Sequence, residues 1–478
     1  MKTYQEYIDS LKDDREVYYR GERVTDVTTH PILKYTPMFL GSYEYHHASD
    51  EKLREELNEL YFIHPELGVK ATKFYRIPRS SADLLEHFEL VNKFTMRYRF
   101  NVSPVGSDMV KALILTSSYL GGEYAKRMSD YAEHLLRETP VLAAAQMDVK
   151  GDRSARPAEQ ADLDLHVHVV DEKPDGIIVR GAKANISWVY AANEIVVIPC
   201  RTMRKGEEEF AIAFATPVNA KGIRLLCRPC LELEPCRNEM ENPRLKAGGH
   251  FGENTIIFDN VFIPWERVFV YKNSAEATRV ALTFALIHRF TSVSYHSGLA
   301  EFLIGAGKLM ADYNGIENAA HIKRDIVDLI DYCEIMKLCV KLAAYECTID
   351  PKTGMAIPNP IYTNLGKLYS NTRYFAAKQA LIDIAGGIAI TAPSSEDYMM
   401  NETLRKDIDK YLAGKGVSGT DRFKLILLIR ELVALWGGLE DVTFIQAEGS
   451  IWASVMELHR TYNYDKVVKA VKENIGIA

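Results

Sequence analysis

The chain has 478 residues, of which 47% are hydrophobic and 26% charged, with a formal net charge of −7 and a pI near 6.1. This composition is typical of a globular protein with two to four domains. The acidic balance argues against nucleic-acid binding, which needs a basic surface. No apolar run approaches the roughly 20 residues of a membrane span, and the first residues form no apolar signal region. We therefore expect a cytoplasmic location.

The first 147 residues are predicted to be mostly helical, with loops. Residue Ser81 begins the string Ser-Ala-Asp-Leu-Leu-Glu-His, in which a capping residue precedes strong helix formers. That order is typical of a helix start. We expect an N-terminal helical domain at 1–147.

Residues 148–277 show short strands separated by turn residues. The run 165–170 alternates as a half-buried strand does, and further runs follow at 177–180, 194–198, 210–214, 223–226 and 255–258. Short strands at regular spacing suggest a small barrel or sandwich, and we predict a central β-barrel domain. His166 and His168 share one strand face. Two histidines can begin a metal site, but a solvent-facing strand edge is the favoured interpretation.

The distribution of proline predicts long helices in the last part of the chain. Fourteen of the eighteen prolines precede residue 265, none lies between Pro264 and Pro351, and none follows Pro393. Because a proline inside a helix costs about 3 kcal/mol, proline-free stretches favour helices. Apolar residues recur at helical spacing through 281–347 and again through 421–436. We expect a C-terminal helical bundle at 278–478, which makes the protein mainly α.

Seven cysteines in a chain of this length do not indicate a secreted disulfide framework, so reduced thiols are expected. Cys227, Cys230 and Cys236 have the spacing C-x2-C-x5-C, which could form half of a zinc or cluster site. His250 is a conceivable fourth ligand. A loop with chance cysteines is the favoured interpretation, and we expect no metal.

Three strings carry a resemblance to known proteins. They are Met147-Asp-Val-Lys-Gly-Asp-Arg153, Val179-Arg-Gly-Ala-Lys-Ala-Asn-Ile-Ser187 and Phe258-Asp-Asn-Val-Phe-Ile-Pro264. The last two resemble the flavin-facing β-domain of acyl-CoA dehydrogenases. Together the three resemble the family of 4-hydroxyphenylacetate 3-hydroxylase and 4-hydroxybutyryl-CoA dehydratase. The resemblance implies an FAD-dependent enzyme with an acyl-CoA dehydrogenase-like three-domain architecture.

A flavin has a polar ring edge and a pyrophosphate, which turn amides and cationic side chains bind well. Lys150, Gly151, Asp152 and Arg153 supply such groups, and an exposed charged turn is the alternative on spacing alone. In the dehydratase branch the matching segment contacts FAD; here Val149 stands where a proline is usual.

The resemblance implies four further cofactor contacts. It places Asn185 and Ser187 against the flavin, where strand-end polarity is the alternative interpretation. Gly386 and Gly387 match a segment that meets the flavin of a neighbouring subunit, although a glycine pair that ends a helix is common. Ser450 lies in Glu448-Gly-Ser450, a shorter match to a second flavin-proximal loop.

The dehydratase branch binds a [4Fe–4S] cluster through three cysteines and one histidine. His288 matches the histidine position, whereas Tyr295, Phe100 and Pro104 stand where the cysteines should be. Since such clusters need thiolates, the sequence argues against radical dehydration. His288 and Tyr295 remain acid–base candidates beside a flavin because residues 288, 292, 295 and 296 share one helical face. A core histidine bonded to backbone is the alternative.

The hydroxylase branch uses an Arg and a Tyr ahead of a Gly–Asp turn to bind a phenol. Here Arg97, Tyr98 and Arg99 precede the turn at 105–108, and Arg97 is the candidate. A histidine usual before the flavin turn is replaced in 143–146.

The favoured function is an FAD-dependent monooxygenase of an aromatic, phenolic substrate, using flavin reduced by a separate reductase. The alternatives are an acyl-CoA lyase or isomerase without a cluster, and a non-catalytic flavin-binding scaffold. The resemblance and the apolar helices together predict a homodimer or homotetramer.

Overall fold

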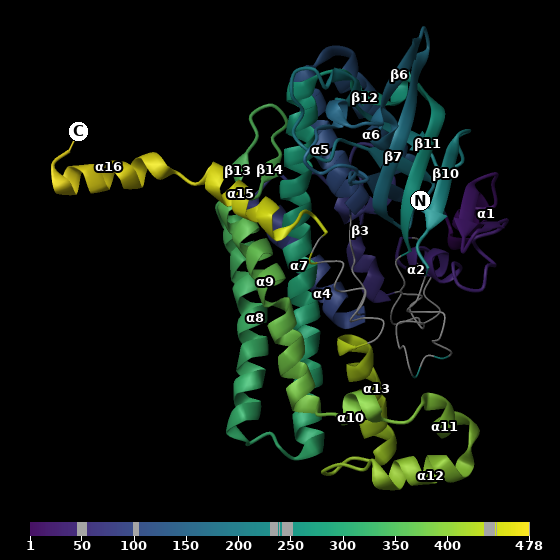
Figure 1. The fold of residues 1–478 in the computed structure, drawn as a ribbon, viewed down its shortest axis with the longest axis vertical. Helices are drawn as coiled ribbons and strands as arrows, with labels where there is room; N and C mark the ends of the chain where they lie inside the picture. The colour runs from purple at the N-terminus through teal and green to yellow at the C-terminus, as the bar shows by residue number, and fades with distance from the viewer. Residues whose placement is uncertain are drawn as a thin grey trace.

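The computed structural model describes residues 1–44, 55–98, 105–229, 238, 240, 252–434, 445 and 447–477. Three long helices stand side by side along the molecule, with the sheets beside one end of them (Figure 1). Among the described residues, no helix is both long and apolar enough to cross a membrane.

The N-terminal part is helical, as expected, but also contains strands. Its helices are α1 (Tyr4–Ser10), α2 (Tyr35–Glu44), α4 (Ser81–Tyr98), α5 (Val105–Leu120) and α6 (Gly122–Glu138). Its strands are β1 (Glu16–Tyr19), β2 (Glu22–Val24), β3 (Tyr61–Ile63), β4 (Lys70–Thr72) and β5 (Leu142–Ala145). Helix α1 begins at a capping box, in which Thr3 and Glu6 satisfy each other's backbone N–H groups.

The predicted strands of the middle region are present. They are β6 (His168–Lys173), β7 (Gly176–Ser187), β8 (Glu194–Val197), β9 (Ala213–Pro217), β10 (Ile223–Cys227), β11 (Glu253–Pro264) and β12 (Val268–Val270). Strands β7 and β11 pair along their length, with bulges in the register. Gly181 makes one close approach possible: its φ is +134°, and a Cβ there would lie 2.4 Å from the carbonyl oxygen of His166.

The expectation of a central β-barrel is wrong. Ten of the described strands form two open mixed sheets, a six-stranded one of order β2-β1-β10-β11-β7-β6 and a four-stranded one of order β12-β9-β8-β5, while β3 pairs separately with β4. Strand β1 pairs in parallel with β10, and β5 in parallel with β8, so N-terminal strands complete both sheets. Strand spacing reports where strands occur and not which strands pair, so it cannot separate a barrel from two open sheets.

The C-terminal part is helical, as its proline distribution predicts. It contains α7 (Ser274–Asn314), α8 (Ala320–Tyr345), α9 (Pro360–Ala385), α10 (Ile388–Thr391), α11 (Ser395–Met400), α12 (Glu402–Tyr411), α13 (Gly419–Val433), α15 (Ile451–Thr461) and α16 (Tyr464–Ile475), with a small hairpin of β13 (Thr348–Ile349) and β14 (Ala356–Ile357). The side chain of Asn273 caps α7, and Asn359 caps α9 ahead of a proline at the first helical position.

Helix α7 lies at the centre of the helical part. It packs against α4, α5, α8 and α9, and every residue from Ile287 to Ala300 is buried. A helix buried on all sides must place its polar side chains against other helices. Those polar side chains form the site described below.

Candidate functional site

Helix α7 brings the predicted pair His288 and Tyr295 into one buried cluster. The two lie two helical turns apart and therefore face the same way, with Ser292 between them. His288 is 7% and Tyr295 1% exposed. The ring of His288 stacks on that of Phe284, with centroids 5.2 Å apart.

The carboxylate of Glu448 is the common partner of the side chains in this cluster. Tyr295 donates to its Oε1 at 2.7 Å, while Ser292 at 3.1 Å and Lys367 of α9 at 2.7 Å donate to Oε2. Nε2 of His288 lies 3.6 Å from Oε1. The side chain of Glu448 is 4% exposed. One carboxylate therefore joins a histidine, a phenol, a hydroxyl and an ammonium in a water-poor interior.

A second carboxylate holds the other side of the histidine ring. Nδ1 of His288 lies 3.0 Å from Oδ2 of Asp108, and Lys111, one turn further along α5, donates to Oδ1 at 3.1 Å. Asp108 is fully buried. A histidine held between two carboxylates has its ring orientation fixed, and either nitrogen can exchange a proton with an acid partner.

The electrostatics favour ionised carboxylates. Burial alone would raise both pKa values, but the charges of Lys367, His288 and His296 lower the pKa of Glu448 to about 2. Lys111 and His288 likewise lower the pKa of Asp108 to about 2. Burial lowers the pKa of Lys367, against the pull of Glu448. The cluster is therefore ionic near neutral pH.

The loop that carries Glu448 is held in a strained conformation. Glu448 has φ +56° and Gly449 has φ +100°. Arg289 of α7 donates from Nε to the carbonyl oxygen of Glu448 at 2.9 Å and from Nη1 to Asn364 at 2.8 Å. A Cβ on Gly449 would lie 2.7 Å from Nη2 of Arg289. Non-glycine residues at positive φ cluster at functional sites.

The predicted flavin turn is a tight, largely exposed loop. Gly151 has φ +52°, and a Cβ there would lie 2.5 Å from Oε1 of Gln160. That same oxygen accepts from the backbone N–H of Asp152 at 3.0 Å, and Oδ1 of Asp152 caps Ser154. Lys150 and Arg153 are exposed. Within the described part of the chain, Arg153 has no carboxylate partner.

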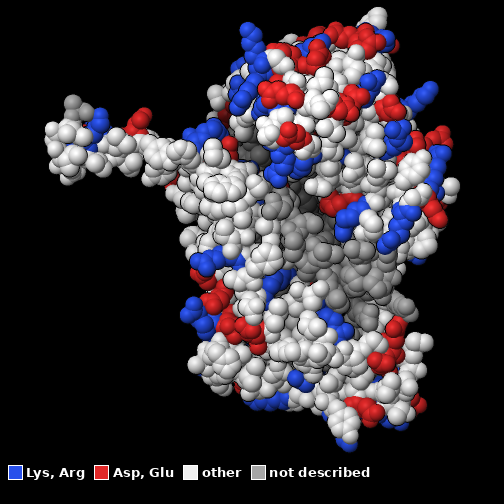
Figure 2. Space-filling model, in the orientation of Figure 1, with Lys and Arg blue, Asp and Glu red and all other residues white. Residues whose placement is uncertain are grey.

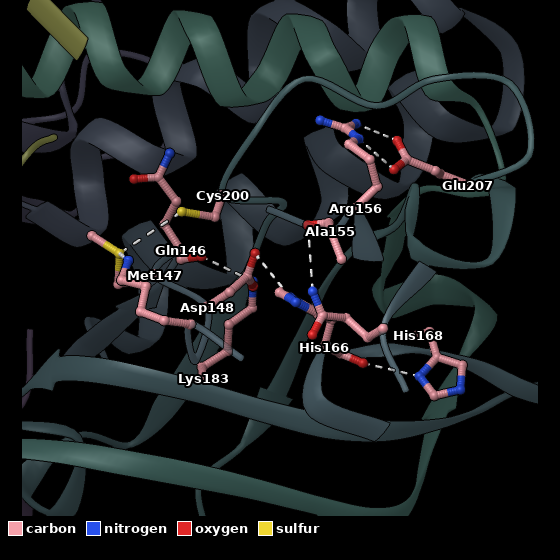
Figure 3. Close-up of polar contacts among 12 residues, drawn as sticks. Gln146, Met147, Asp148, Ala155, Arg156, His166, His168, Lys183, Cys200 and Glu207 are labelled. Atoms are coloured by element: carbon pink, nitrogen blue, oxygen red, sulfur yellow. Dashed lines mark hydrogen bonds and ion pairs between the residues drawn. The ribbon is translucent and has the colours of Figure 1, made fainter. Parts of the chain in front are cut away.

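Asp148, at the start of that turn, faces inward instead (Figure 3). Lys183 of β7 donates to its Oδ1 at 2.6 Å and also to the carbonyl oxygens of Gln146 and Ile198, each at 2.9 Å. Nδ1 of His166 lies 3.5 Å from Oδ2 of Asp148. This cluster ties the turn to the sheets.

The interpretation of His166 and His168 as a solvent-facing strand edge is wrong. His166 is 2% and His168 8% exposed. His168 stacks on Phe210, with centroids 5.0 Å apart, and its Nδ1 contacts the carbonyl oxygen of His166 at 2.9 Å. Short H-x-H strings carry no signal for burial, because alternation shows only that both side chains share one face.

The other predicted cofactor residues lie in three separate places. Asn185, with φ +55°, is exposed near the end of β7, where Ser187 donates to Glu253 at 2.8 Å. Ser450 directly precedes α15 and follows the Glu448 loop. Gly386 and Gly387 are exposed between α9 and α10, at the far end of the long helices from the sheets (Figure 1). Within one chain Gly386 and Gly387 therefore lie far from the flavin turn.

Several predicted features fall outside the described residues. Arg97 lies in the last turn of α4, but its side chain is not described. Arg99, Phe100 and Pro104 are not described at all. The same holds for Cys230, Cys236 and His250, whereas Cys227 is half-buried at the end of β10. Among the described residues, no group of three or more His, Cys, Asp or Glu could hold a metal ion.

Sequence reasoning missed the partners of His288. Glu448 lies within a string already singled out as flavin-proximal, but no local signal marks it as the acid that meets His288. Asp108 was assigned to a Gly–Asp turn at 105–108, but the structure places it in the first turn of α5, and Lys367 was not singled out. A lysine or aspartate at an otherwise apolar helical position is the signal that could have found them, because such charges are almost never buried unpaired.

Comparisons with known proteins place this chain in a family. A model described as 4-hydroxyphenylacetate 3-hydroxylase N terminal matches residues 3–270, and the corresponding C-terminal model matches residues 277–476. The chain therefore belongs to the 4-hydroxyphenylacetate 3-hydroxylase family.

Two relatives and one solved structure are similar over most of the chain. The 4-hydroxybutyryl-CoA dehydratase/vinylacetyl-CoA-Δ-isomerase of Clostridium aminobutyricum is 25% identical over 91% of each chain. The oxygenase component of 4-hydroxyphenylacetate 3-monooxygenase of Thermus thermophilus is 26% identical, over 89% of this chain and 87% of that protein. A crystal structure of such an oxygenase component, complexed with FAD and 4-hydroxyphenylacetate, has a TM-score of 0.88 at 24% identity over 99% of each chain. That last likeness concerns the fold.

Proposed function

We propose that this protein is the oxygenase component of an FAD-dependent monooxygenase that acts on a phenolic substrate. The observation that carries the proposal is the buried acid–base cluster of His288, Tyr295 and Glu448 on the scaffold of this family. Hydroxylation of a phenol requires removal of the phenolic proton, and a histidine between two carboxylates is suited to accept it.

The residues of the 147–153 turn fit an FAD. Arg153 and Lys150 are exposed cations that flank the tight turn at Gly151. This donor set suits a pyrophosphate or the polar edge of the flavin ring. Asn185, Ser187 and Ser450 are the further proposed contacts, with Gly386 and Gly387 supplied by a neighbouring copy. When bound, reduced flavin supplies the electrons that activate molecular oxygen.

In this proposal the protein's own groups move the proton. His288 takes the phenolic proton on Nε2, the nitrogen that faces Glu448, while Asp108 fixes the ring from Nδ1. Tyr295 donates to Glu448 and stabilises it as an anion, and Arg97 is the proposed contact to the phenolic oxygen. The reducing equivalents come from a separate flavin reductase, and a cytoplasmic location remains a prediction from the composition.

Assembly into a homodimer or homotetramer is part of the proposal. Helix α16 extends away from the body as an arm (Figure 1), and the face shown in Figure 2 carries few charges on this arm compared with the region of the sheets. Val471 and Ile475 of α16 are 58% and 64% exposed, and Trp452 of α15 is 73% exposed. Such exposed apolar side chains favour packing on a second copy.

The division into domains at 1–147, 148–277 and 278–478 also stays a prediction.

The test begins with the cofactor. Saturation with FAD should shift the flavin absorbance and quench its fluorescence. Arg153→Ala should weaken binding by about 1.5–3 kcal/mol, because it removes a hydrogen bond from a charged group. Arg373→Ala, on the outer face of α9, is the control and should bind FAD as the parent does. The anaerobically reduced protein should then consume oxygen faster with a phenol than without one. Absence of any flavin binding would overturn the proposal.

A lyase or isomerase of an acyl-CoA is the second candidate. The observation that favours it is the Glu448–His288 pair, which could abstract a proton beside a carbonyl, in a chain 25% identical to a dehydratase/isomerase. It predicts turnover of an acyl-CoA with no oxygen consumed. Tyr295 stands where a cluster cysteine is expected and donates instead to Glu448, so we predict no [4Fe–4S] cluster. An iron and sulfide assay that finds near four of each per anaerobically purified chain would contradict this prediction.

A further inference from the structure

A small internal cavity adjoins the buried pair of Asp108 and Lys111. It has a volume of about 30 Å³ and lies between α4, α5, α7 and the strand β14. This is too small for an organic ligand, whereas a buried water needs only about 10–15 Å³ of such space. The cavity therefore has room for about two water molecules.

The inner end of the cavity carries polar groups with unused hydrogen-bonding capacity. Lys111 is 4% exposed, and among the described residues its only hydrogen bond goes to Oδ1 of Asp108, at 3.1 Å. An ammonium has three N–H groups, and a carboxylate has about four acceptor positions. Because buried polar groups are nearly always satisfied by protein or by ordered water, the spare donors of Lys111 and the spare acceptors of Asp108 predict water in the cavity.

The outer end of the cavity reaches the surface. Lys73, Arg76, Asp83 and Glu86 line it there, and their side chains are between 24% and 36% exposed. Lys73 pairs with Glu86 at 2.9 Å and Arg76 with Asp83 at 3.2 Å. These partly hydrated ion pairs bring bulk water to the mouth of the cavity.

Asp108 joins the cavity to the acid–base cluster. It lines the cavity and contacts Nδ1 of His288 at 3.0 Å, whereas His288 itself does not line the cavity. In the reaction proposed above, a substrate covers Nε2 of His288, so a proton has to leave the ring through Nδ1. Burial would raise the pKa of Asp108, but Lys111 and His288 lower it to about 2. A carboxylate of low pKa passes a proton on and does not retain it.

We propose that this cavity holds ordered water and is the route by which His288 exchanges protons with bulk solvent. A proton that arrives on Nε2 makes the ring cationic. The Nδ1–H bond then breaks, and Oδ2 of Asp108 takes that proton and gives it to a cavity water. That water gives up a proton toward the mouth, which leaves Asp108 ionised and the water neutral. Lys111 is a positioning residue, because its spare N–H groups hold the oxygen of the first water beside Asp108.

The nature of the group that delivers the proton rests on the proposed function, but the route does not. A high-resolution crystal structure of the full chain should show about two ordered waters in the cavity, with one of them bonded to Lys111 and Asp108. A cavity without water density would overturn the proposal, whatever the protein catalyses.

Exchange of the Nδ1 proton of His288 with water tests the route itself. NMR of the full chain with isotopically labelled histidine measures the exchange rate without substrate, in both FAD-free and FAD-saturated protein. The signal that His288→Gln removes assigns the proton. His168 gives an internal control, because its Nδ1 donates to the carbonyl oxygen of His166 within the sheets. Since no substrate is present, the result stands independently of the monooxygenase activity.

Variants at the cavity should slow the exchange at His288 and leave the exchange at His168 unchanged. In Leu84→Phe the larger ring should fill the cavity and exclude the waters, and the loss of their hydrogen bonds should slow exchange at least about tenfold. Leu85→Phe is the matched control, because the next residue on α4 does not line the cavity. An exchange rate at His288 that is the same in Leu84→Phe as in the parent would refute the route.

Lys111→Met tests the positioning role. It removes the donors that hold the first water, so exchange at His288 should slow about tenfold. Lys126→Met removes an exposed lysine that also pairs with an aspartate and should leave exchange unchanged. If Lys111→Met does not fold, the two leucine variants decide. A folded Lys111→Met with the exchange rate of the parent would remove Lys111 from the route.

Discussion

Two buried lysine–carboxylate pairs, one in the sheets and one among the helices, look alike but differ in their surroundings. Lys183 lies 2.6 Å from Asp148, and Lys367 lies 2.7 Å from Glu448. In the first pair the side chains are 3% and 8% exposed, and in the second 0% and 4%. Distance and burial alone would assign both pairs the same role.

The partners of the two pairs separate them. Lys183 uses its ammonium on Asp148 and on two backbone carbonyl oxygens, so all three N–H groups are satisfied by a rigid frame. Glu448 instead receives groups that can exchange protons, namely His288, Tyr295 and Lys367, from a loop at positive φ. Asp148 has one titratable neighbour besides Lys183, His166 at 3.5 Å, whereas Glu448 has three such partners. A lysine satisfied by backbone carbonyls stabilises the fold, whereas a carboxylate with several titratable partners is suited to chemistry.

Lys183→Met should give the largest loss of stability. It leaves Asp148 buried without its cation, which costs about 3–5 kcal/mol. Urea unfolding measures the change. Lys173→Met, which removes an exposed lysine paired with Asp171, is the control and should cost less than about 1 kcal/mol. A loss as small as that of the control would show that the sheet pair is not structural.

Glu448→Gln should affect turnover more than folding. The amide keeps the shape of the side chain but removes the negative charge that faces His288, and general acid–base groups contribute about 10²- to 10⁴-fold to rates. Oxygen consumption with a phenol that the parent protein hydroxylates measures the effect, and urea unfolding of the same variant measures stability. A variant that unfolds as Lys183→Met does, with turnover unchanged per folded molecule, would reverse the assignment of the two pairs.

Gly449→Ala tests whether the buried cluster of His288, Tyr295 and Glu448 depends on the conformation of the loop that carries Glu448. The residue has φ +100°, and a Cβ would lie 2.7 Å from Nη2 of Arg289. We expect a loss of about 1–3 kcal/mol, the usual cost of such strain, with reduced turnover as Glu448 shifts. Gly305→Ala is the control, because nothing lies within 4 Å of that Cβ and an alanine favours the helix. Equal stability of the two variants would contradict the strain argument.

The sequence located elements better than it located partners. Helices α7 and α8 follow from the proline-free, helically spaced stretch at 281–347, and α13 follows from the stretch at 421–436. Most strands follow from alternation. The order of strands in the sheets could not be predicted, because β1 pairs with β10 across about 200 residues and no local pattern encodes that pairing. Likewise, the family resemblance singled out His288 and Tyr295, and their spacing placed them on one face of a helix. Glu448 joins them from 153 residues beyond Tyr295, and its role became visible only with the fold.

Between pH 6 and 5, the pH dependence of stability gives the smallest effect per residue, and it comes mainly from two histidines buried among the helices. Burial, with the nearby charge of Lys367, lowers the pKa of His296 from 6.5 to about 3. Between those values the unfolded chain binds a proton that the folded protein does not, so stability is full above pH 6.5 and falls as pH falls toward 3. The expected slope is about 1.4 kcal/mol per pH unit for each such histidine, and His87 adds a second.

His296→Gln should remove about half of that slope. Urea unfolding at intervals between pH 6 and 5 isolates the histidines, because the ionised Glu448 and Asp108 begin to contribute only below their unfolded pKa values of 4.5 and 3.8. Above pH 7 the parent and the variant should show the same slope, which serves as the internal control. If the variant keeps the full slope between pH 6 and 5, the acid sensitivity of the protein does not come from the buried ring of His296.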